Sequence, residues 1–317
     1  MKRSISPERA IRRALDGVVL LDKPLGMSSN QALQRVRHLY HASKAGHTGT
    51  LDPLATGLLP LCLGEATKYS GWILDAPKSY RATLCLGMTS DTGDGEGILT
   101  VGNPFAGDEK QVQHVLQSFL GIRQQIPPMY SALKVKGKVL YQLARQGESV
   151  VREPRTIQVH ELELLDWHAN QLTLVTTVSK GTYIRVLAEE IGDALGCGAY
   201  LSELQRVGTG PFQLSQAVTL ETLEQESQSE RDRHLLPVDS LLKGIPDQVL
   251  EVSLAHALSQ GRVVEGNPAW APGLYRAYDT QKRFYGLVQI DEPGGNVIPK
   301  RMMGERTQEA RDATQIG

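Results

Sequence analysis

Residues 46–57 have the sequence Gly46-His47-Thr48-Gly49-Thr50-Leu51-Asp52-Pro53-Leu54-Ala55-Thr56-Gly57. Glycine and proline are so frequent here that the segment 41–57 is predicted to be an irregular loop. His47 precedes Asp52 by five positions, and Pro53 restricts Asp52 to an extended backbone. Taken alone, the loop is more typical of a plain Asp-Pro turn with an Asx hydrogen bond than of a catalytic site. Polar, glycine-rich loops between regular elements are nevertheless where functional residues gather.

Regular elements are predicted on both sides of this loop. The valine-rich run 17–23 stops at Pro24 and predicts a buried strand. Ser28 or Ser29 can then cap a helix that reaches about residue 40, with Gln31 completing a capping box. After the loop, the apolar run 58–63 is the next regular element.

Strands and helices follow one another without strict alternation along the rest of the chain, which favours an α+β fold over a doubly wound sheet. Strands are predicted at 79–86, 156–167 and 172–179, and helices at 108–121, 137–145 and 184–195. The acidic turn 89–97 lacks the spacing of a calcium loop. The polar residues 221–236 predict a domain boundary or an exposed insertion. From about Val249, short apolar runs and many turn residues predict a compact β-rich module.

Composition narrows the class of protein. A length of 317 residues suggests about two domains. No apolar run is long enough for a membrane span, and the polar N-terminus does not resemble a secretory signal. Three widely spaced cysteines fit reduced thiols rather than disulfides or zinc ligands. We therefore expect a cytoplasmic protein. The net charge is −1, but residues 1–90 contain 12 Lys and Arg against 6 Asp and Glu, which suits an RNA-binding face.

Several motifs, in matching order over about residues 17–240, resemble the TruB family of RNA pseudouridine synthases in its bacterial form. They are Gly17–Pro24, Gly26–Ser29, Gly46–Gly57, Gly64–Lys68, Lys78–Tyr80, Thr89–Asp94, Pro127–Lys134, Ser179–Arg185 and Leu235–Asp239. The resemblance implies an enzyme that isomerises uridine 55 in the T-arm of tRNA. The target base is flipped out, its N-glycosidic bond is cleaved, and the uracil is rejoined to the sugar through C5.

The resemblance also implies the fold and the domains. It predicts a pseudouridine synthase catalytic domain at 17–245, with a mixed, mainly antiparallel sheet flanked by helices. An N-terminal extension, 1–16, precedes this domain. A small β-barrel-like PUA domain at 249–303 and a polar tail, 304–317, follow it.

Four residues match the catalytic residues of the family. Asp52 matches the catalytic aspartate, which either attacks the sugar or removes a sugar proton to give a glycal; the sequence leaves both routes open. Arg185 matches the arginine that offsets the desolvation of this carboxylate. Tyr80 matches a tyrosine that stacks on the extruded base and assists removal of the C5 proton. Tyr183 matches a second tyrosine, expected to hold the geometry of the Asp52–Arg185 pair.

Five further residues are implied to contact RNA or the base. His47 is expected to fill the gap left by the flipped base. Lys23 is expected to support the pocket, Lys68 to contact phosphate, and Leu204 to form the apolar wall. Lys134 lies in a segment, 121–153, that we expect to close on the RNA.

The sequence departs from the family at one position. After Leu204 the family usually has adjacent arginines, whereas Gln205 precedes Arg206 in this chain. The departure puts an RNA or supporting contact in doubt, but not the reaction.

Three functions remain open at this point. The chain is a stand-alone tRNA-modifying enzyme, an RNA-binding protein whose main task is to remodel the tRNA elbow, or a guide-RNA-dependent synthase. The bacterial-type C-terminal module argues against a guide RNA. The isomerisation needs no redox change or external energy, so no cofactor and no metal are expected. We expect a monomer that binds tRNA through the T-arm, with the acceptor stem on the C-terminal domain, and that has no membrane partner.

Overall fold

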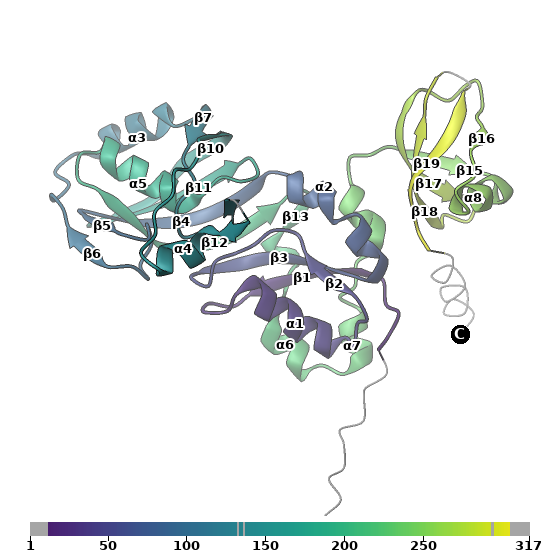
Figure 1. Ribbon diagram of the computed structural model, residues 1–317, viewed down its shortest axis with the longest axis horizontal. Helices are drawn as coiled ribbons and strands as arrows, with labels where there is room; N and C mark the ends of the chain where they lie inside the picture. The colour runs from purple at the N-terminus through teal and green to yellow at the C-terminus, as the bar shows by residue number, and fades with distance from the viewer. Residues whose placement is uncertain (1–11, 132, 136, 293–294, 305–317) are drawn as a thin grey trace, which may run out of the picture.

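The computed structural model describes residues 12–131, 133–135, 137–292 and 295–304 (Figure 1). The predicted N-terminal extension and polar tail therefore lie largely outside the described residues. A ten-stranded sheet forms the body of the molecule, and a second sheet forms a separate lobe at the C-terminal end. No helix in the described part of the chain is long and apolar enough to cross a membrane.

The large sheet has the order β14-β1-β3-β12-β4-β11-β10-β7, with β2 paired to β3 and β13 to β12. Only the pairs β1–β14 and β3–β12 are parallel. The predicted mixed, mainly antiparallel sheet in an α+β fold is therefore confirmed. Its strands are β1 (Gly17–Lys23), β2 (Ala45–His47), β3 (Ala55–Leu63), β4 (Lys78–Leu86), β7 (Gly121–Gln125), β10 (Arg155–His168), β11 (Gln171–Val178), β12 (Ala199–Thr209), β13 (Phe212–Gln213) and β14 (Val218–Thr219).

The buried sides of α1, α3, α5 and α6 share one hydrophobic core, and α2 packs into a second core. Ser28 caps α1 and forms the predicted capping box with Gln31. Asp108 caps α3, as predicted. The helices are α1 (Ser29–Leu39), α2 (Ser70–Asp75), α3 (Glu109–Ser118), α4 (Leu140–Arg145), α5 (Ile184–Ala194), α6 (Leu220–Gln225) and α7 (Gln228–Asp232), with the 3-10 turns η1 (Gly64–Lys68), η2 (Leu214–Gln216) and η3 (Val238–Leu242). Two small hairpins pair β5 (Met88–Ser90) with β6 (Leu99–Val101) and β8 (Lys134–Val135) with β9 (Lys138–Val139).

Strand β1 separates two hydrophobic cores. Val19 and Leu21 face the larger core, which also contains the buried sides of α1, α3 and α5. Val18 and Leu20 face the second core, to which the C-terminal lobe contributes Phe284. Successive residues of a strand point to opposite faces, so a strand buried on both faces is apolar throughout.

The second sheet has the order β15-β17-β18-β19-β16 and one helix, α8. Its elements are β15 (Asp247–Leu250), α8 (Val252–Ser259), β16 (Val264–Glu265), β17 (Gly273–Asp279), β18 (Phe284–Ile290) and β19 (Asn296–Met302). Tyr278 donates a hydrogen bond to Asp239 at 2.6 Å, and Tyr69 donates one to the carbonyl of Arg301 at 2.9 Å. These contacts fasten the second sheet to the body of the molecule.

Three details of the sequence prediction are wrong. The irregular segment is shorter than 41–57, because Ala45–His47 adds an edge strand to β3 and β3 already begins at Ala55. Residues 221–236 are not an exposed insertion. They form most of α6 and α7, and Tyr40 of the α1 C-cap donates a hydrogen bond to the carbonyl of Arg231. Helix α4 begins at Leu140 rather than at 137, because β9 precedes it.

Candidate active site

The loop that carries Asp52 is held from both sides. The hydroxyl of Ser29, the first residue of α1, accepts a hydrogen bond from the Leu51 N–H at 2.7 Å and donates one to the Leu51 carbonyl at 3.0 Å. The carbonyl of Pro53 accepts from the N–H of Gly26 at 2.8 Å. Ser29 is buried, so both bonds lie out of contact with water. The backbone on either side of Asp52 is therefore fixed to α1 and to the turn that precedes it.

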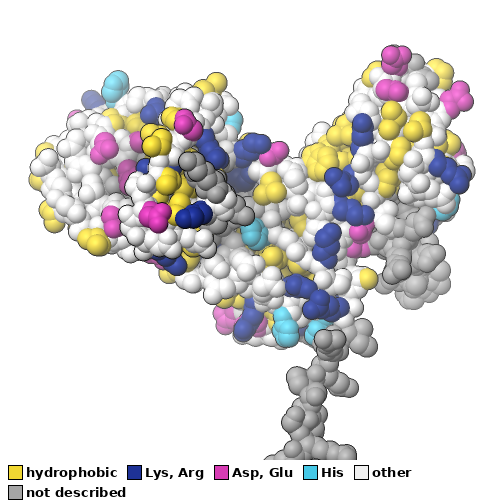
Figure 2. All heavy atoms as spheres, in the orientation of Figure 1, with side chains coloured by type: hydrophobic (Ala, Val, Ile, Leu, Met, Phe, Trp, Pro, Cys, Tyr) yellow, Lys and Arg dark blue, Asp and Glu magenta, His cyan; other side chains and the backbone are white. Residues whose placement is uncertain are grey.

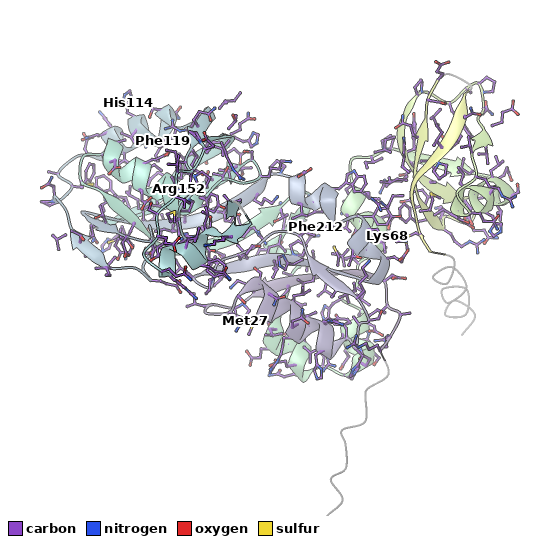
Figure 3. All side chains as sticks on the ribbon, in the orientation of Figure 1. Met27, Lys68, His114, Phe119, Arg152 and Phe212 are labelled. Carbon is purple, nitrogen blue, oxygen red and sulfur yellow. The ribbon has the colours of Figure 1, made fainter. Side chains whose placement is uncertain are left out.

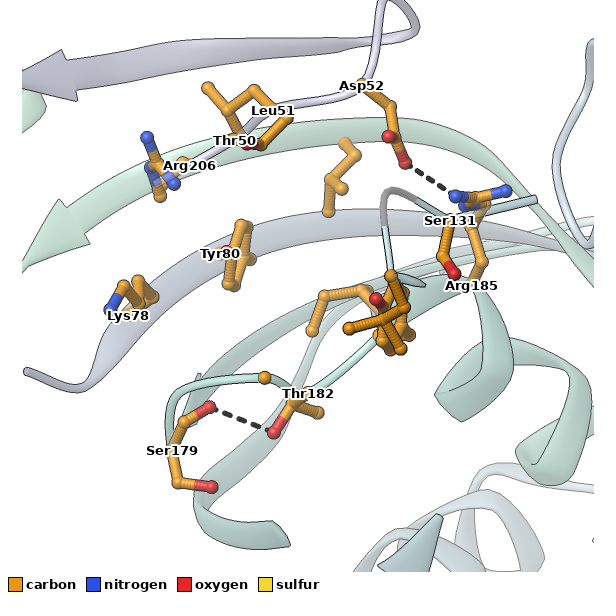
Figure 4. A pocket seen from close by; sticks show the side chains of 15 residues that line it. Thr50, Leu51, Asp52, Lys78, Tyr80, Ser131, Ser179, Thr182, Arg185 and Arg206 are labelled. Carbon is orange, nitrogen blue, oxygen red and sulfur yellow. Dashed lines mark hydrogen bonds and ion pairs between the residues drawn. The ribbon is translucent and has the colours of Figure 1, made fainter. Parts of the chain in front are cut away.

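Asp52 forms an ion pair with Arg185. Its Oδ2 lies 2.8 Å from Nη2 of Arg185 (Figure 4). The two side chains differ in exposure, 46% for Asp52 and 7% for Arg185. The carboxylate therefore reaches into open space while the guanidinium lies beneath it.

Arg185 has three further partners. Its Nη1 lies 3.3 Å from Oδ2 of the buried Asp94 and donates to the carbonyl of Thr92 at 3.1 Å. Its Nη2 donates to the carbonyl of Tyr130 at 2.8 Å. A guanidinium with this many partners has one preferred position, which in turn fixes the carboxylate of Asp52.

Asp94 is a site residue that the sequence analysis did not identify. It lies in the acidic turn 89–97, where the hydroxyl of Thr92 donates to its Oδ1 at 2.7 Å and the N–H of Glu96 donates at 3.1 Å. The charge of this turn thus faces Arg185. The motif Thr89–Asp94 indicated a turn. The sequence did not show that Asp94 pairs with Arg185, because the two residues are far apart in the chain.

A cavity of about 310 Å³ opens beside the ion pair. This volume is near the lower end of small-molecule sites, about 300–1,000 Å³. It is lined by Thr50, Leu51, Asp52, Lys78, Tyr80, Ser131, Leu133, Ser179, Gly181, Thr182, Tyr183, Ile184, Arg185, Leu204 and Arg206. Figure 4 shows Asp52 and Arg185 at one end, Lys78 and Arg206 at the other, and Tyr80 between them. The wall is thus partly aromatic and aliphatic, with charged groups at both ends.

The two tyrosines named from the sequence both line this cavity. Tyr80 lies on β4 and is 9% exposed. Tyr183 is the N-cap residue of α5, and burial raises the pKa of its hydroxyl. The side chain of Gln125 accepts from the N–H of Tyr183 at 2.8 Å and donates to its carbonyl at 3.1 Å. Gln125 was not identified from the sequence, and it positions the start of the helix that carries Arg185.

Besides Arg185, three buried cations lie at or near the cavity: Lys23, Lys78 and Arg206. Burial lowers the pKa of Lys23 to about 8, and the charge of Asp52 opposes this shift. Burial also lowers the pKa of Lys78 to about 8. Nζ of Lys78 donates to the carbonyls of Ile73, Leu74 and Ala76, at the end of α2.

Lys23 and Arg206 hold the backbone around the loop that carries Asp52. Nζ of Lys23 donates to the carbonyls of Pro24 and Met27 at 2.9 and 2.6 Å. Nε of Arg206 donates to the carbonyl of Leu58 at 2.7 Å. Nη2 of Arg206 is buried and has no hydrogen-bond partner among the described residues. The placement of Lys23 is compatible with the supporting role expected from the sequence.

The remaining predicted residues lie at different distances from the cavity. His47 ends β2 and does not line the cavity; burial, followed by the charge of Arg206, lowers the pKa of its imidazole. Leu204 lies on β12 in the cavity wall, opposite Ala55 of β3. Lys134 is in β8, and its side chain lies outside the described residues.

Lys68 lies at the junction between the catalytic body and the C-terminal lobe (Figure 3). Its Nζ is 2.5 Å from Oε2 of Glu65 and donates to the carbonyl of Met302 at 3.3 Å. The positive charge of Lys68 is therefore paired with the carboxylate of Glu65, and its side chain also connects the two lobes.

The departure at Gln205 lies outside the cavity. Leu204 and Arg206 on either side of it line the cavity, whereas Gln205 faces a separate surface hollow with Thr56 and Glu203. Close pairing of β12 with β3 requires Gly57, because a Cβ there would collide with the backbone of Arg206 and φ is +96°. The missing arginine therefore does not alter the cavity.

The residues that line the cavity can stabilise a negative charge, a positively charged sugar and a planar base at adjacent points. Asp52 is the exposed carboxylate in contact with a fixed cation, so it is available as a nucleophile or a base. Tyr80 supplies a flat surface for a ring. The narrow cavity admits a single nucleotide that has left a helical stack, but not a duplex.

Three family models match consecutive parts of the chain. The TruB family pseudouridylate synthase N-terminal domain matches residues 37–184. The tRNA pseudouridylate synthase B C-terminal domain matches 185–243, and the C-terminal model of pseudouridine synthase II TruB matches 246–303. The first match contains Asp52 and the second begins at Arg185, so both contribute to the ion pair.

Similar proteins cover nearly the whole chain. The tRNA pseudouridine synthase B of Methylobacillus flagellatus is 49% identical over 295 residues, which are 93% of this chain and 97% of the relative. That of Dechloromonas aromatica is 50% identical over 293 residues, 92% and 96% of the two chains. Among solved structures, a chain from a Cbf5-Nop10-Gar1 complex matches with a TM-score of 0.69 and 26% identity, covering 92% of this chain and 86% of that one.

Proposed function

The chain belongs to the TruB family of tRNA pseudouridine synthases, and we propose that it converts uridine 55 in the T-arm of tRNA to pseudouridine. The observation that carries the proposal is the ion pair between Asp52 and Arg185 at one end of a cavity that Tyr80 also lines. Segments that match the family from residue 17 to residue 240 support the choice of uridine 55.

The reaction begins with extraction of the uridine from the folded RNA. Unstacking a base costs a few kcal/mol, and a side chain that fills the gap lowers this cost. His47 lies outside the cavity, at the end of the strand that leads into the catalytic loop. Its lowered pKa keeps the imidazole neutral near pH 7, which suits stacking against bases.

Isomerisation then exchanges one bond to the sugar for another. The bond from C1′ to N1 of the uracil breaks, and a bond from C1′ to C5 forms. C5 loses a proton and N1 gains one, so the product has the same atoms and oxidation level as the substrate. The Asp52 carboxylate assists the first bond cleavage, either by attack on the sugar or by removal of a sugar proton.

Arg185 and the tyrosines act around this carboxylate. Arg185 keeps the carboxylate of Asp52 correctly aimed, because the guanidinium is itself anchored by Asp94 and by two backbone carbonyls. Tyr80 holds the detached uracil flat while it turns, and its hydroxyl assists loss of the C5 proton. Tyr183 begins the helix that carries Arg185 and closes one wall of the cavity.

The substrate is expected to span both lobes. The T-arm loop occupies the cavity, and the acceptor stem, which stacks on the T-stem, reaches the C-terminal lobe. Lys300 and Arg301 of β19 are exposed there and are candidate phosphate partners. We expect a monomer to be sufficient, since one chain carries the whole cavity, and we expect the enzyme to work in the cytoplasm on free tRNA.

Mapping the modified base tests this proposal. An unmodified tRNA transcript is incubated with the purified protein alone, treated with a carbodiimide that marks pseudouridine, and read by primer extension. The expected result is a single new stop one nucleotide to the 3′ side of position 55, which reports pseudouridine at that position. A stop at another position would contradict the choice of substrate base, and a reaction that requires an added guide RNA would contradict the stand-alone enzyme.

A further inference from the structure

A cluster of basic side chains lies at the C-terminal end of α1, away from the catalytic cavity. Arg12, Arg37, His38 and His41 surround a hollow of about 290 Å³ together with Gln34 and Ala42. Arg12 and His38 are exposed, and the rings of His38 and His41 lie 6.1 Å apart. We call these four residues the α1-end cluster.

This cluster is one end of a continuous basic band. Nη2 of Arg37 donates to the carbonyl of Ser43, which precedes the exposed Lys44. The carbonyl of Lys44 accepts from the N–H of Gly64, where η1 begins. At the other end of η1, Lys68 contacts the carbonyl of Met302. In Figure 2, dark-blue side chains follow one another from the C-terminal lobe to the lower edge of the body, where cyan histidines lie.

The positive charge of the band is only partly neutralised. The carboxylates beside it are already engaged: Glu65 with Lys68, and Asp232 with Arg13. No carboxylate within the described ranges lies at ion-pair distance from Arg12, Arg37 or Lys44. Unpaired cations around a solvent-filled hollow repel one another, and a bound polyanion relieves that repulsion.

The backbone of the cluster is also unusual. His41 has φ of +50°, the left-handed conformation that ends α1. The N–H of Ala42 donates to the carbonyl of Arg37, which is the bond that closes a helix in this way. Glycine fits this position best, so the histidine occupies it at an energetic cost. The imidazole of His41 is a hydrogen-bonding ring, and it lines the hollow together with Arg12 and Arg37.

The direction of the band decides which part of the RNA reaches the cluster. On the proposed function, the T-stem and acceptor stem run from the cavity to the C-terminal lobe. The band runs from that lobe through Lys68 and through Lys44, beside Gly64 at the end of β3, and reaches the α1-end cluster at the opposite end from that lobe. A T-arm hairpin placed between cavity and lobe therefore leaves the cluster uncovered. The rest of the tRNA, which joins the T-arm at the elbow, is what remains to cover it.

We propose that the α1-end cluster is a second RNA-phosphate site, which holds the backbone of the tRNA arm that meets the T-arm at the elbow. This inference rests on the proposed function, because it takes tRNA as the substrate. Arg12 contributes a guanidinium that has no ion-pair partner within the described residues, His38 and His41 contribute ring N–H donors, and Arg37 contributes charge while holding the loop 42–43.

The test compares two RNAs and two protein variants. The RNAs are an unmodified full-length tRNA transcript and the T-arm hairpin of the same sequence. The test variant is Arg12→Gln combined with His38→Gln; neither side chain has a hydrogen bond in the described part of the chain that the fold would lose. The matched control is Arg35→Gln, an exposed arginine of the same helix that is paired with Glu224 outside the hollow.

The double variant is expected to weaken the affinity for full-length tRNA about fivefold, and to reduce the slope of log affinity against log salt by about one unit. Its affinity for the hairpin and its rate of turnover of the hairpin stay unchanged. The Arg35→Gln variant binds both RNAs as the wild type does.

Three results would overturn the inference. They are an equal loss of affinity for hairpin and full-length tRNA, no loss for either RNA, or the same loss in the Arg35→Gln variant. The hairpin reaction separates this outcome from failure of the proposed function. If wild type does not modify the hairpin or the tRNA, the proposed function fails, whereas the binding comparison still reports on the cluster.

Discussion

Arg185 lies between two carboxylates that differ in exposure. Asp52 is open to the cavity, whereas Asp94 is buried beneath the guanidinium. Both carboxylates contact the guanidinium of Arg185. We therefore expect a change at Asp94 to alter the position of Asp52 and the net charge around it. The position of the Asp52 carboxylate therefore depends on a residue that does not line the cavity.

Replacement of Asp94 by asparagine is expected to lower kcat by about 10- to 100-fold, because a charged hydrogen bond is worth roughly 1.5–3 kcal/mol. Asparagine keeps the size of the side chain, so KM for the hairpin is expected to change little. Single-turnover kinetics on the T-arm hairpin measure the effect. Asp91→Asn is the matched control. Asp91 lies in the same turn and accepts from the N–H of Ile98, but it is exposed and forms no ion pair with Arg185 within the described residues.

An unchanged kcat in Asp94→Asn, or an equal loss in Asp91→Asn, would show that Asp94 serves only the turn. Rescue of the rate by Asp94→Glu, which restores the charge, would further separate an electrostatic role from a structural one.

The sequence predicted some of these residues and not others, for identifiable reasons. Asp52 and Arg185 lie in distinctive motifs, so the resemblance to a family selects both. Asp94 and Gln125 act through partners that are distant in the chain. In the sequence, Asp94 belongs to an acidic turn and to the motif Thr89–Asp94, but no role was assigned to it. Gln125 lies in the segment 121–153 that we expected to close on the RNA, and nothing marked it as a positioning residue. Their functions depend on the sheet topology that brings α5 against both segments.

Adjacent serines at the start of α1 have different structural partners. Ser28 is the N-cap, and its hydroxyl accepts from the N–H of Gln31 at 3.2 Å. Ser29 turns inward and bonds both backbone groups of Leu51. Of these two serines, Ser29 is the one that is hydrogen-bonded to the loop carrying Asp52.

Ser29→Ala is expected to lower the free energy of unfolding by about 1–2 kcal/mol, since it leaves two buried backbone groups without this partner. We also expect kcat to fall about tenfold, because the loop carrying Asp52 loses its anchor. Urea unfolding and hairpin turnover measure the two effects.

Ser28→Ala is the control, because it is expected to cost about 1 kcal/mol of stability through loss of the cap. Its kcat is expected to equal that of the wild type. If both variants lost activity in proportion to their loss of stability, the anchoring of the loop by Ser29 would be refuted.

Helices and strands with strong local signals were predicted closely. The capping box of α1, the cap of α3 and the hairpin of β10 and β11 are each specified by neighbouring residues. The errors occurred where tertiary contacts decide. The strand β2 exists because it pairs with β3, and α6 packs against α1 despite the polar composition of 221–236. Local propensity does not contain that information.

At the scale of the whole molecule, buried charges make stability depend on pH. Burial lowers the pKa of Lys78 to about 8 in the folded protein, compared with an ordinary value of 10.5. Between these pH values the unfolded chain binds more protons than the folded one. The contribution of Lys78 to the free energy of unfolding is therefore least favourable below pH 8, and it improves as pH rises from about 8 to 10.5.

The variant Lys78→Met isolates this contribution. The free energy of unfolding of wild type minus that of the variant is expected to be larger at about pH 9.5 than at about pH 7. The subtraction cancels other groups, such as the thiol of Cys62, whose pKa is raised by burial. Denaturant unfolding at the two pH values gives the difference, and an identical difference at both would contradict a lowered pKa for Lys78.

The two lobes are joined by a shared hydrophobic core. Because they are joined, the molecule extends along the proposed RNA path from one lobe to the other. Phe284 of the C-terminal sheet packs 5.8 Å from Tyr69 of the catalytic body, measured between ring centroids. The sequence indicated a β-rich module from turn residues and short apolar runs. Its attachment could not be predicted, because Tyr69 and Phe284 look like ordinary core aromatics in isolation.

The measurement that tests the central claim most directly is tritium release from C5-labelled uridine in an unmodified T-arm hairpin, with wild type and Asp52→Asn compared side by side. Asparagine has nearly the shape of aspartate but neither its charge nor its basicity. We predict release by the wild type and none by Asp52→Asn, with both proteins binding the hairpin. Release by the variant at the wild-type rate would contradict the account, because the carboxylate at the mouth of the cavity would then not carry the reaction.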